Sequence, residues 1–144
     1  MKKGFTLAVA ESCTGGLISS MITSVPGSSA FFLGGVVSYS NSSKENILKV
    51  KLSTMIENGA VSEKTAVEMA AGAKALLGSD VSISVTGIAG PGGGTAAKPV
   101  GLVWIGISTK ETTFAKKFNF GGNRNEVQSS AANAAIELLI ETIK

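Results

Sequence analysis

Two patterns of apolar residues alternate along the chain. Short continuous apolar runs are typical of buried strands, and apolar residues that recur every three or four positions are typical of helices packed on one side. The runs predict strands at residues 5–10, 36–39, 81–85, 101–108 and 112–120. The spaced pattern, with its serine, glycine and proline boundaries, predicts helices at residues 17–22, 41–48, 52–58, 62–77 and 124–144. Residues 41–43 are expected to cap the second of these helices.

The order of these elements predicts the fold class. Strands and helices alternate in the first part of the chain, and the last two strands flank Lys110-Glu111 like a hairpin. We therefore expect an α/β protein, a three-layer α/β/α sandwich with a mixed β-sheet. No linker, repeat or low-complexity tail divides residues 1–144, so we expect a single domain.

Charge is scarce in this sequence. Charged residues make up 16% of the chain, whereas roughly 25% is typical of soluble domains. A surface so poor in charge favours a homodimer or higher homo-oligomer, in which part of each surface is covered. The lysines are scattered and form no stripe with aromatic residues, so we expect no nucleic-acid partner. No apolar stretch reaches the ~18 residues of a membrane span, and no membrane partner is expected.

Two residue types limit the possible chemistry. The chain has no histidine and one cysteine. Catalysis by a Ser-His-Asp or Cys-His arrangement within one chain is therefore excluded, and so is a zinc site with the usual ligands. A lone cysteine forms no intrachain disulfide, which agrees with a cytoplasmic location.

Three loops that follow predicted strands carry polar residues or glycines, at residues 11–16, 39–44 and 86–94. Ligands of open α/β sheets bind beyond the carboxyl ends of the strands, so these loops are the expected site. Ser12 is a candidate nucleophile, because N–H groups at a helix start favour negative charge. The motif alone, however, favours a helix cap formed by Ser12 or Thr14. Cys13 is the rival nucleophile, although small buried cysteines are commonly inert.

A serine nucleophile needs a base, and three residues are candidates. Lys44 can act as the base if burial or neighbouring positive charge lowers its pKa toward neutrality. The alternative is a solvent-exposed lysine on a helix, as most lysines are. Tyr39, the only tyrosine, is equally consistent with an amphipathic residue at the edge of the core. Glu11 has three candidate roles: the base, a partner of another site residue, or a carboxylate that complements the helix N-terminus.

Two further features suit an anionic ligand. The glycine-rich segment at residues 87–94 offers backbone N–H groups to an anion or oxyanion, or is an ordinary glycine-rich hairpin loop. It lacks the Gly-Lys-Ser/Thr sequence of a Walker loop. Arg124, the only arginine, stands at a predicted helix start and is suited to bidentate contact with a phosphate.

Taken in order, these segments resemble the C-terminal domain family of CinA, the competence- and damage-inducible proteins. The matching residues are 10–16 (AESCTGG), 27–30 (GSSA), 39–41 (YSN), 59–62 (GAVS), 87–91 (GIAGP), 98–101 (KPVG) and the Gly121-x-x-Arg124 pattern. Their order and spacing cover nearly the whole chain. Stand-alone members of this family are amidohydrolases. They convert nicotinamide mononucleotide to nicotinate mononucleotide and ammonia, without a metal or cofactor, by a serine–lysine mechanism.

The resemblance implies roles for the candidate residues. Ser12 is the nucleophile, Lys44 is the base that activates it, and Tyr39 supplies a supporting hydroxyl. The substrate is a small nucleotide of pyridine-nucleotide salvage. The residues implied for substrate binding are Glu11, Thr14, Gly15, Asn41, Thr86, Gly87 and Arg124, of which the last binds the phosphate.

The sequence departs from the family in two places. Family members usually have a helix before the first strand, whereas this chain reaches that strand at residue 5. Asn123 stands where an aspartate is common.

A second hypothesis is that the chain is a non-catalytic regulatory domain, which binds a nucleotide or a protein partner in the same cleft. A Ser12–Lys44 pair favours the enzyme, and an exposed Lys44 distant from Ser12 favours the binding role.

Overall fold

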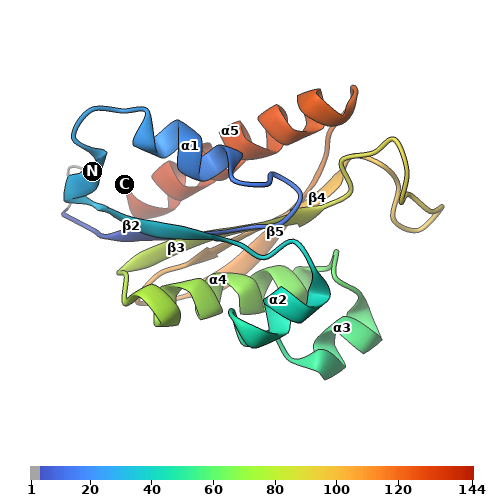
Figure 1. Cartoon of the computed structure of the whole chain (residues 1–144), viewed down its shortest axis with the longest axis horizontal. Coiled ribbons are helices and arrows are strands. Elements are labelled where there is room, and N and C mark those ends of the chain that lie inside the picture. Colours follow the sequence, from blue (N-terminus) through green and yellow to red (C-terminus); the bar gives the residue numbers. More distant parts are fainter. Residues whose placement is uncertain (1–3) are drawn as a thin grey trace.

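The computed structural model describes residues 4–144, and its centre is a five-stranded mixed sheet (Figure 1). The strands follow one another across the sheet in the order β2-β1-β3-β4-β5. β2 and β3 both run parallel to β1, and β4 and β5 continue the sheet as antiparallel strands. The strands are β1 (Leu7–Glu11), β2 (Phe32–Val37), β3 (Val81–Gly87), β4 (Leu102–Ser108) and β5 (Thr113–Asn119).

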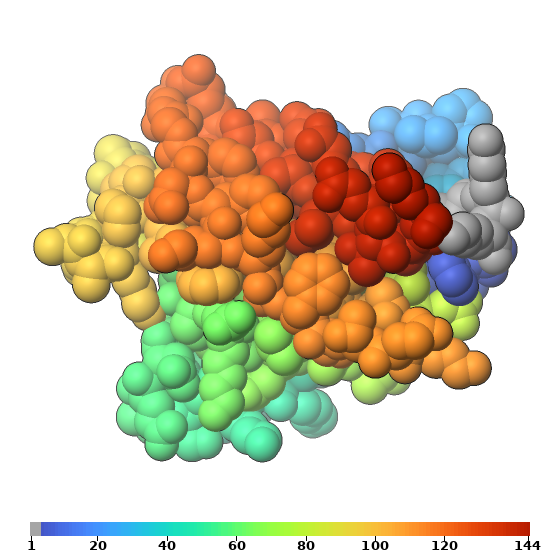
Figure 2. All heavy atoms as spheres, turned by 180° about the vertical axis from the view of Figure 1, so that it is seen from behind, coloured from blue at the N-terminus to red at the C-terminus, as the bar shows by residue number. Residues whose placement is uncertain are grey.

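Helices cover both faces of the sheet, which confirms the predicted α/β/α sandwich (Figure 1). One face carries α1 (Leu17–Thr23) and α5 (Arg124–Ile143). The other carries α4 (Glu63–Leu77), with α2 (Asn41–Asn46) and α3 (Leu52–Asn58) beside it. Seen from behind, α5 and β5 lie in front, and the segment between β3 and β4 projects at one end (Figure 2). In residues 4–144, no helix combines the length and the apolar character that a membrane crossing needs.

The two faces of the sheet are packed differently. The face under α1 and α5 holds the larger apolar core, which includes Leu7, Val9, Ile18, Ile83, Ile105, Ile107, Val127 and Leu139. On the α4 face the hydroxyls of Ser82 and Ser84 donate to the carbonyl oxygens of Ala70 and Ala66, each at 2.6 Å. A Cβ at Gly106 would lie 2.6 Å from the Ala66 oxygen. Small side chains therefore let α4 approach the sheet closely, and the buried hydroxyls remain hydrogen-bonded.

The structure corrects two predicted boundaries around the second strand. The strand predicted at 36–39 spans residues 32–37 and follows a 3-10 turn at Ser28–Ala30, so Tyr39 lies beyond it. Glycines weaken a strand pattern, but here a Cβ at Gly35 would collide with Ser19 of α1. The cap of α2 is Ser40 rather than residues 41–43, because its Oγ accepts the Ser43 N–H at 3.0 Å.

We expect Gly72→Ala to destabilise the fold, although alanine has the higher helix propensity. The added Cβ would collide with the carbonyl oxygen of Leu48, and overpacking of this kind costs about 1–3 kcal/mol. The free energy of unfolding from urea titration, followed by circular dichroism, measures the loss. Gly121→Ala is the control, because nothing lies within 4 Å of its added Cβ. Equal stability of the two variants would contradict the close packing of α4 on Leu48.

Candidate active site

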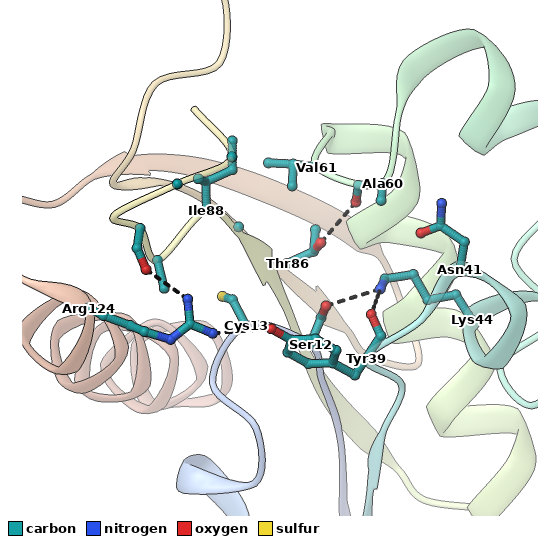
Figure 3. A pocket seen from close by; sticks show the side chains of 15 residues that line it. Ser12, Cys13, Tyr39, Asn41, Lys44, Ala60, Val61, Thr86, Ile88 and Arg124 are labelled. Atoms are coloured by element: carbon teal, nitrogen blue, oxygen red, sulfur yellow. Dashed lines mark hydrogen bonds between the residues drawn. The ribbon is translucent and has the colours of Figure 1, made fainter. Parts of the chain in front are cut away.

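A cavity of about 270 Å³ opens where the segments that follow β1, β2 and β3 meet (Figure 3). This is the sheet edge at which the sequence predicts a site. The first turns of α2 and α5 and the turn before α4 complete its wall. The lining residues are Ser12, Cys13, Tyr39, Asn41, Lys44, Ala60, Val61, Thr86, Gly87, Ile88, Ala89, Gly90, Gly92, Gly93 and Arg124.

Ser12 is the first residue after β1, and its backbone is fixed from two sides. Its N–H donates to the Val85 oxygen of β3 at 3.0 Å, and its own carbonyl accepts the Gly15 N–H at 3.1 Å. Its Oγ lies 3.0 Å from Nζ of Lys44. The N-cap position of α1 is Gly16, and N–H groups of the first turn donate to the side chain of Glu11 and not to that of Ser12 or Thr14. The helix-cap reading of Ser12 and Thr14 is therefore wrong, and the Ser12 hydroxyl is directed at the lysine.

Lys44 is held on α2 with only 1% of its surface exposed. Its Nζ donates to the Ser12 Oγ at 3.0 Å, the Ser38 carbonyl oxygen at 2.9 Å and the Tyr39 carbonyl oxygen at 3.1 Å. All three acceptors are uncharged. Burial lowers the pKa of Lys44 from 10.5, because desolvation disfavours the ammonium form, and the opposing effect of Cys13 is smaller.

The two carbonyl oxygens determine what a neutral Lys44 can do. A carbonyl oxygen only accepts hydrogens, and a neutral amine has two hydrogens and one lone pair. The Ser38 and Tyr39 oxygens take the two hydrogens, which leaves the lone pair for the Ser12 hydroxyl. The arrangement can therefore remove a proton from Ser12 and later return it to a leaving group.

Glu11 lies behind Ser12 and serves α1. It is fully buried, and its carboxylate accepts five hydrogen bonds. Oε1 accepts from Thr14 Oγ1 at 2.7 Å, from the Gly16 N–H at 3.2 Å and from the Ile18 N–H at 2.9 Å. Oε2 accepts from the N–H and the Oγ of Ser19, at 2.9 and 2.7 Å. Of the three roles considered for Glu11, the structure selects the complement to the helix N-terminus.

This arrangement changes the expected binding set. The N–H groups at the start of α1 were expected to face negative charge on a ligand, but the Glu11 carboxylate takes them. Glu11, Thr14 and Gly15 do not line the cavity. They shape the turn that presents Ser12 instead of reaching the ligand space.

Cys13 lines the cavity beside Ser12 but has only 6% of its surface exposed. Burial raises the pKa of its thiol to about 11, because the thiolate would be poorly solvated. The thiolate is the nucleophilic form of cysteine. At neutral pH the rival nucleophile is therefore a protonated thiol.

Arg124 and Tyr39 meet at the other end of the cavity (Figure 3). The guanidinium donates through Nη1 to the Gly90 oxygen at 2.7 Å and through Nη2 to the Tyr39 hydroxyl at 3.1 Å. The Tyr39 hydroxyl is thus placed next to Arg124, while the Tyr39 carbonyl holds Lys44. Asn123 caps α5 in a reciprocal capping box with Glu126, so asparagine serves as helix cap at this position.

The remaining predicted residues are also in the wall. Thr86 ends the buried part of β3, and its Oγ1 donates to the Ala60 oxygen at 2.8 Å, which ties β3 to the turn before α4. A Cβ at Gly87 would lie 2.7 Å from the Leu102 oxygen, so only glycine fits this bend. Asn41 of α2 lines the cavity next to Lys44 (Figure 3).

Two residues that help to form the site were not predicted from the sequence. Ser38 acts through its backbone oxygen, which any residue would supply, so no residue type could signal it. Gln128 donates from Nε2 to the Cys13 oxygen at 2.9 Å and so fixes the turn after Ser12. Its position one helical turn after Arg124 was a usable signal, because residues i and i+4 share a helix face.

Comparison with known proteins identifies relatives over the whole domain. The family model of the CinA C-terminal domain matches residues 1–143. A CinA-like protein of Leptospira borgpetersenii is 54% identical over 145 residues, which cover 100% of this chain and 35% of the relative. A CinA-like protein of Thermotoga maritima is 50% identical over 139 residues, which cover 96% of this chain and 34% of the relative. The chain therefore spans about a third of the length of the curated relatives it matches.

Solved structures have the same fold. The competence/damage inducible protein CihA of Agrobacterium tumefaciens superposes with a TM-score of 0.96 at 39% identity, over 99% of this chain and 88% of that chain. A competence-damaged protein (CinA) superfamily protein of Escherichia coli gives a TM-score of 0.95 at 34% identity, over 99% of this chain and 83% of that chain.

We expect Glu11→Gln to destabilise the protein by about 2 kcal/mol, the scale of a hydrogen bond to a charged group. The amide NH2 of glutamine would replace one acceptor oxygen and face hydrogen-bond donors of α1. Urea unfolding measures the change, and Glu57→Gln on the exposed side of α3 is the matched control. An unchanged midpoint for Glu11→Gln would contradict the anchoring role.

Proposed function

The chain belongs to the CinA C-terminal domain family, and we propose that it is an amidohydrolase that cleaves a carboxamide with Ser12 and Lys44. The proposed substrate is nicotinamide mononucleotide, and the products are nicotinate mononucleotide and ammonia. The observation that supports this most is the 3.0 Å contact between Ser12 Oγ and Nζ of a lysine with 1% exposure. We place this reaction in the cytoplasm, in pyridine-nucleotide salvage.

The proposed reaction begins with proton transfer from Ser12 to neutral Lys44 as Oγ attacks the carboxamide carbon. Backbone N–H groups of the cavity wall stabilise the tetrahedral oxyanion. The Lys44 ammonium then donates its proton to the amide nitrogen, which leaves as ammonia, and an acyl-Ser12 ester remains. Lys44 next accepts a proton from water as the water oxygen attacks the ester carbon. The C–O bond to Ser12 then breaks, nicotinate mononucleotide is released as the acid, and the Lys44 ammonium returns its proton to the Ser12 oxygen.

Charge supports a nucleotide as substrate. The Arg124 guanidinium is held at the cavity wall by two uncharged oxygens. We assign the substrate phosphate to this end of the cavity, because guanidinium groups match phosphate oxygens in charge and geometry. The carboxamide then reaches Ser12 at the other end. The glycine-rich segment between the two ends lets the ligand approach the backbone.

The main prediction concerns the two central residues. Ser12→Ala and Lys44→Ala are each expected to lower kcat for ammonia release from nicotinamide mononucleotide by about 10³-fold or more, because each removes one half of a unit that acts together. The assay quantifies ammonia and nicotinate mononucleotide from the same reaction. Lys64→Ala, on the exposed side of α4, is expected to retain wild-type activity.

The same assay distinguishes the enzyme from a regulatory binding domain. Equal activity in wild type and both site variants would contradict the mechanism. A folded wild type that binds nicotinamide mononucleotide without hydrolysing it would support the binding role. The buried contact of Lys44 supports the enzyme, since the binding role goes with an exposed lysine far from Ser12.

The pH dependence of kcat/KM follows from the state of Lys44. Only the neutral amine accepts the Ser12 proton, so the rate is expected to rise with pH through the pKa of Lys44. Because burial lowers that pKa from 10.5, the ascending limb should lie below the range of an ordinary lysine. Lys44→Arg is expected to be inactive at every pH, because a guanidinium does not deprotonate in proteins. A flat profile, or a limb at the ordinary lysine pKa, would contradict this assignment.

A further inference from the structure

A second cavity lies on the α4 face of the sheet, where α4 begins. Its volume is about 280 Å³, close to the 270 Å³ of the active-site cavity. β5, the start of α4 and the segment between β3 and β4 come together on the face that Figure 2 shows. The wall includes Val61, Glu63, Lys98, Trp104 and Lys117, and the proposed function gives no role to any of them.

The hollow forms because β4 and β5 extend beyond the helix that covers them. Gly106 of β4 packs against the Ala66 oxygen of α4, and side chains two residues apart on a strand share a face. Trp104 therefore also lies on the α4 side of the sheet. Since α4 begins at Glu63, just before Ala66, its first turn lies near Gly106 and leaves Trp104 half-buried.

The turn before α4 separates the two cavities. Val61 of this turn lines both of them. On the active-site side, Thr86 Oγ1 donates to the Ala60 oxygen at 2.8 Å. On the other side, Nζ of Lys98 donates to the Asn58 oxygen at 2.6 Å. The turn is therefore fixed from both sides, and neither member of the proposed catalytic pair lines the second cavity.

Three kinds of chemical group line the second cavity. Trp104, the only tryptophan of the chain, offers a flat indole ring. Lys117 is directly opposite Trp104 in the β4–β5 pairing, which places the two side chains next to each other. Lys98 adds a second ammonium group, and Glu63 supplies a carboxylate. In residues 4–144 no hydrogen bond occupies the indole N–H or the Lys117 ammonium, and no unpaired side-chain donor is buried, so both are accessible to a ligand.

We propose that the second cavity binds a mononucleotide that is not the substrate. The base stacks on the indole ring of Trp104, as bases do on aromatic side chains. The phosphate binds Lys98 and Lys117 through charge-assisted hydrogen bonds. A ribose hydroxyl donates to Glu63, as it does to the acidic residue of dinucleotide-binding folds. The ring, the cations and the carboxylate thus match the three parts of one nucleotide.

Size and charge favour this class of ligand. Pockets for drug-sized ligands measure roughly 300–1,000 Å³, so a cavity of about 280 Å³ is enough for one nucleotide and too small for a dinucleotide. Two lysines against one glutamate leave a positive excess, which attracts an anion. A neutral aromatic ligand would leave both ammonium groups unused. The site does not rest on the proposed function, because its ligand is detected by binding and not by turnover.

The first test is a titration with adenosine monophosphate (AMP), followed by tryptophan fluorescence. Because Trp104 is the only tryptophan, the signal reports on this cavity, and a saturable change is expected. Lys117→Ala should raise the Kd for AMP about tenfold, or ~1.4 kcal/mol. Lys116→Ala is the matched control, since this lysine lies over the Phe118 ring on the other face of β5. The absence of a saturable change, or an equal Kd in the two variants, would overturn the proposal.

The second test asks which group binds which part of the nucleotide. Adenosine lacks the phosphate, so wild type should bind it about tenfold more weakly than AMP, and Lys117→Ala should reduce this difference. Trp104→Leu removes the ring, and calorimetry should show a Kd for AMP raised about tenfold, the scale of stacking between a base and an aromatic side chain. Equal affinity of wild type for adenosine and AMP would contradict the role of the lysines.

Arg124→Ala distinguishes the second cavity from the active site. This variant removes the guanidinium that we assign to the substrate phosphate, and its Kd for AMP is expected to equal that of wild type. Loss of AMP binding in Arg124→Ala would place AMP in the active-site cavity and overturn the second site. An unchanged Kd supports the second site, whatever the catalytic activity of the variant.

Discussion

The site depends on the burial of one amine. An ammonium group removed from water is costly unless other groups compensate for the lost solvation, and the acceptors around Lys44 are uncharged oxygens. Two of these oxygens belong to residues 38 and 39, where the chain leaves β2 and enters α2 under the Ser40 cap. The end of the strand, the cap and the first turn of the helix therefore act together to hold the amine against Ser12. A shift of any one would separate the pair.

The buried carboxylate of Glu11 does not pair with Lys44, which leaves the Lys44 amine free to be neutral. A carboxylate paired with Lys44 would raise its pKa, and Glu11 immediately precedes Ser12. All five hydrogen bonds of Glu11 are instead directed to α1 and the turn before it. Helix N–H groups thus balance the negative charge, and the turn that they fix presents Ser12. The carboxylate and the amine therefore have different partners, although both lie next to Ser12.

The sequence predicted the elements well, because the apolar spacing reflects which faces are buried. It misplaced β2, since Gly34 and Gly35 look like a break, and only the tertiary contact with Ser19 shows why position 35 is a glycine. Ser12 and Lys44 were predicted as a catalytic pair because the chain has no histidine and because it resembles the family. Their spacing in the sequence did not by itself indicate that they lie together. The Ser38 oxygen was beyond sequence reasoning, because a backbone carbonyl has no residue signature, and the role of Glu11 required the position of α1.

The cavity wall holds its two basic side chains with uncharged oxygens. Arg124 bonds to the Gly90 carbonyl and the Tyr39 hydroxyl, and Lys44 bonds to two carbonyls and the Ser12 hydroxyl. No acidic residue is among those that line the cavity in residues 4–144. The guanidinium charge is therefore not neutralised from within the wall and remains available to an anionic ligand. The same absence of carboxylates leaves the pKa of Lys44 lowered by burial and so favours the neutral amine. One property of the wall therefore serves both ends of the proposed substrate.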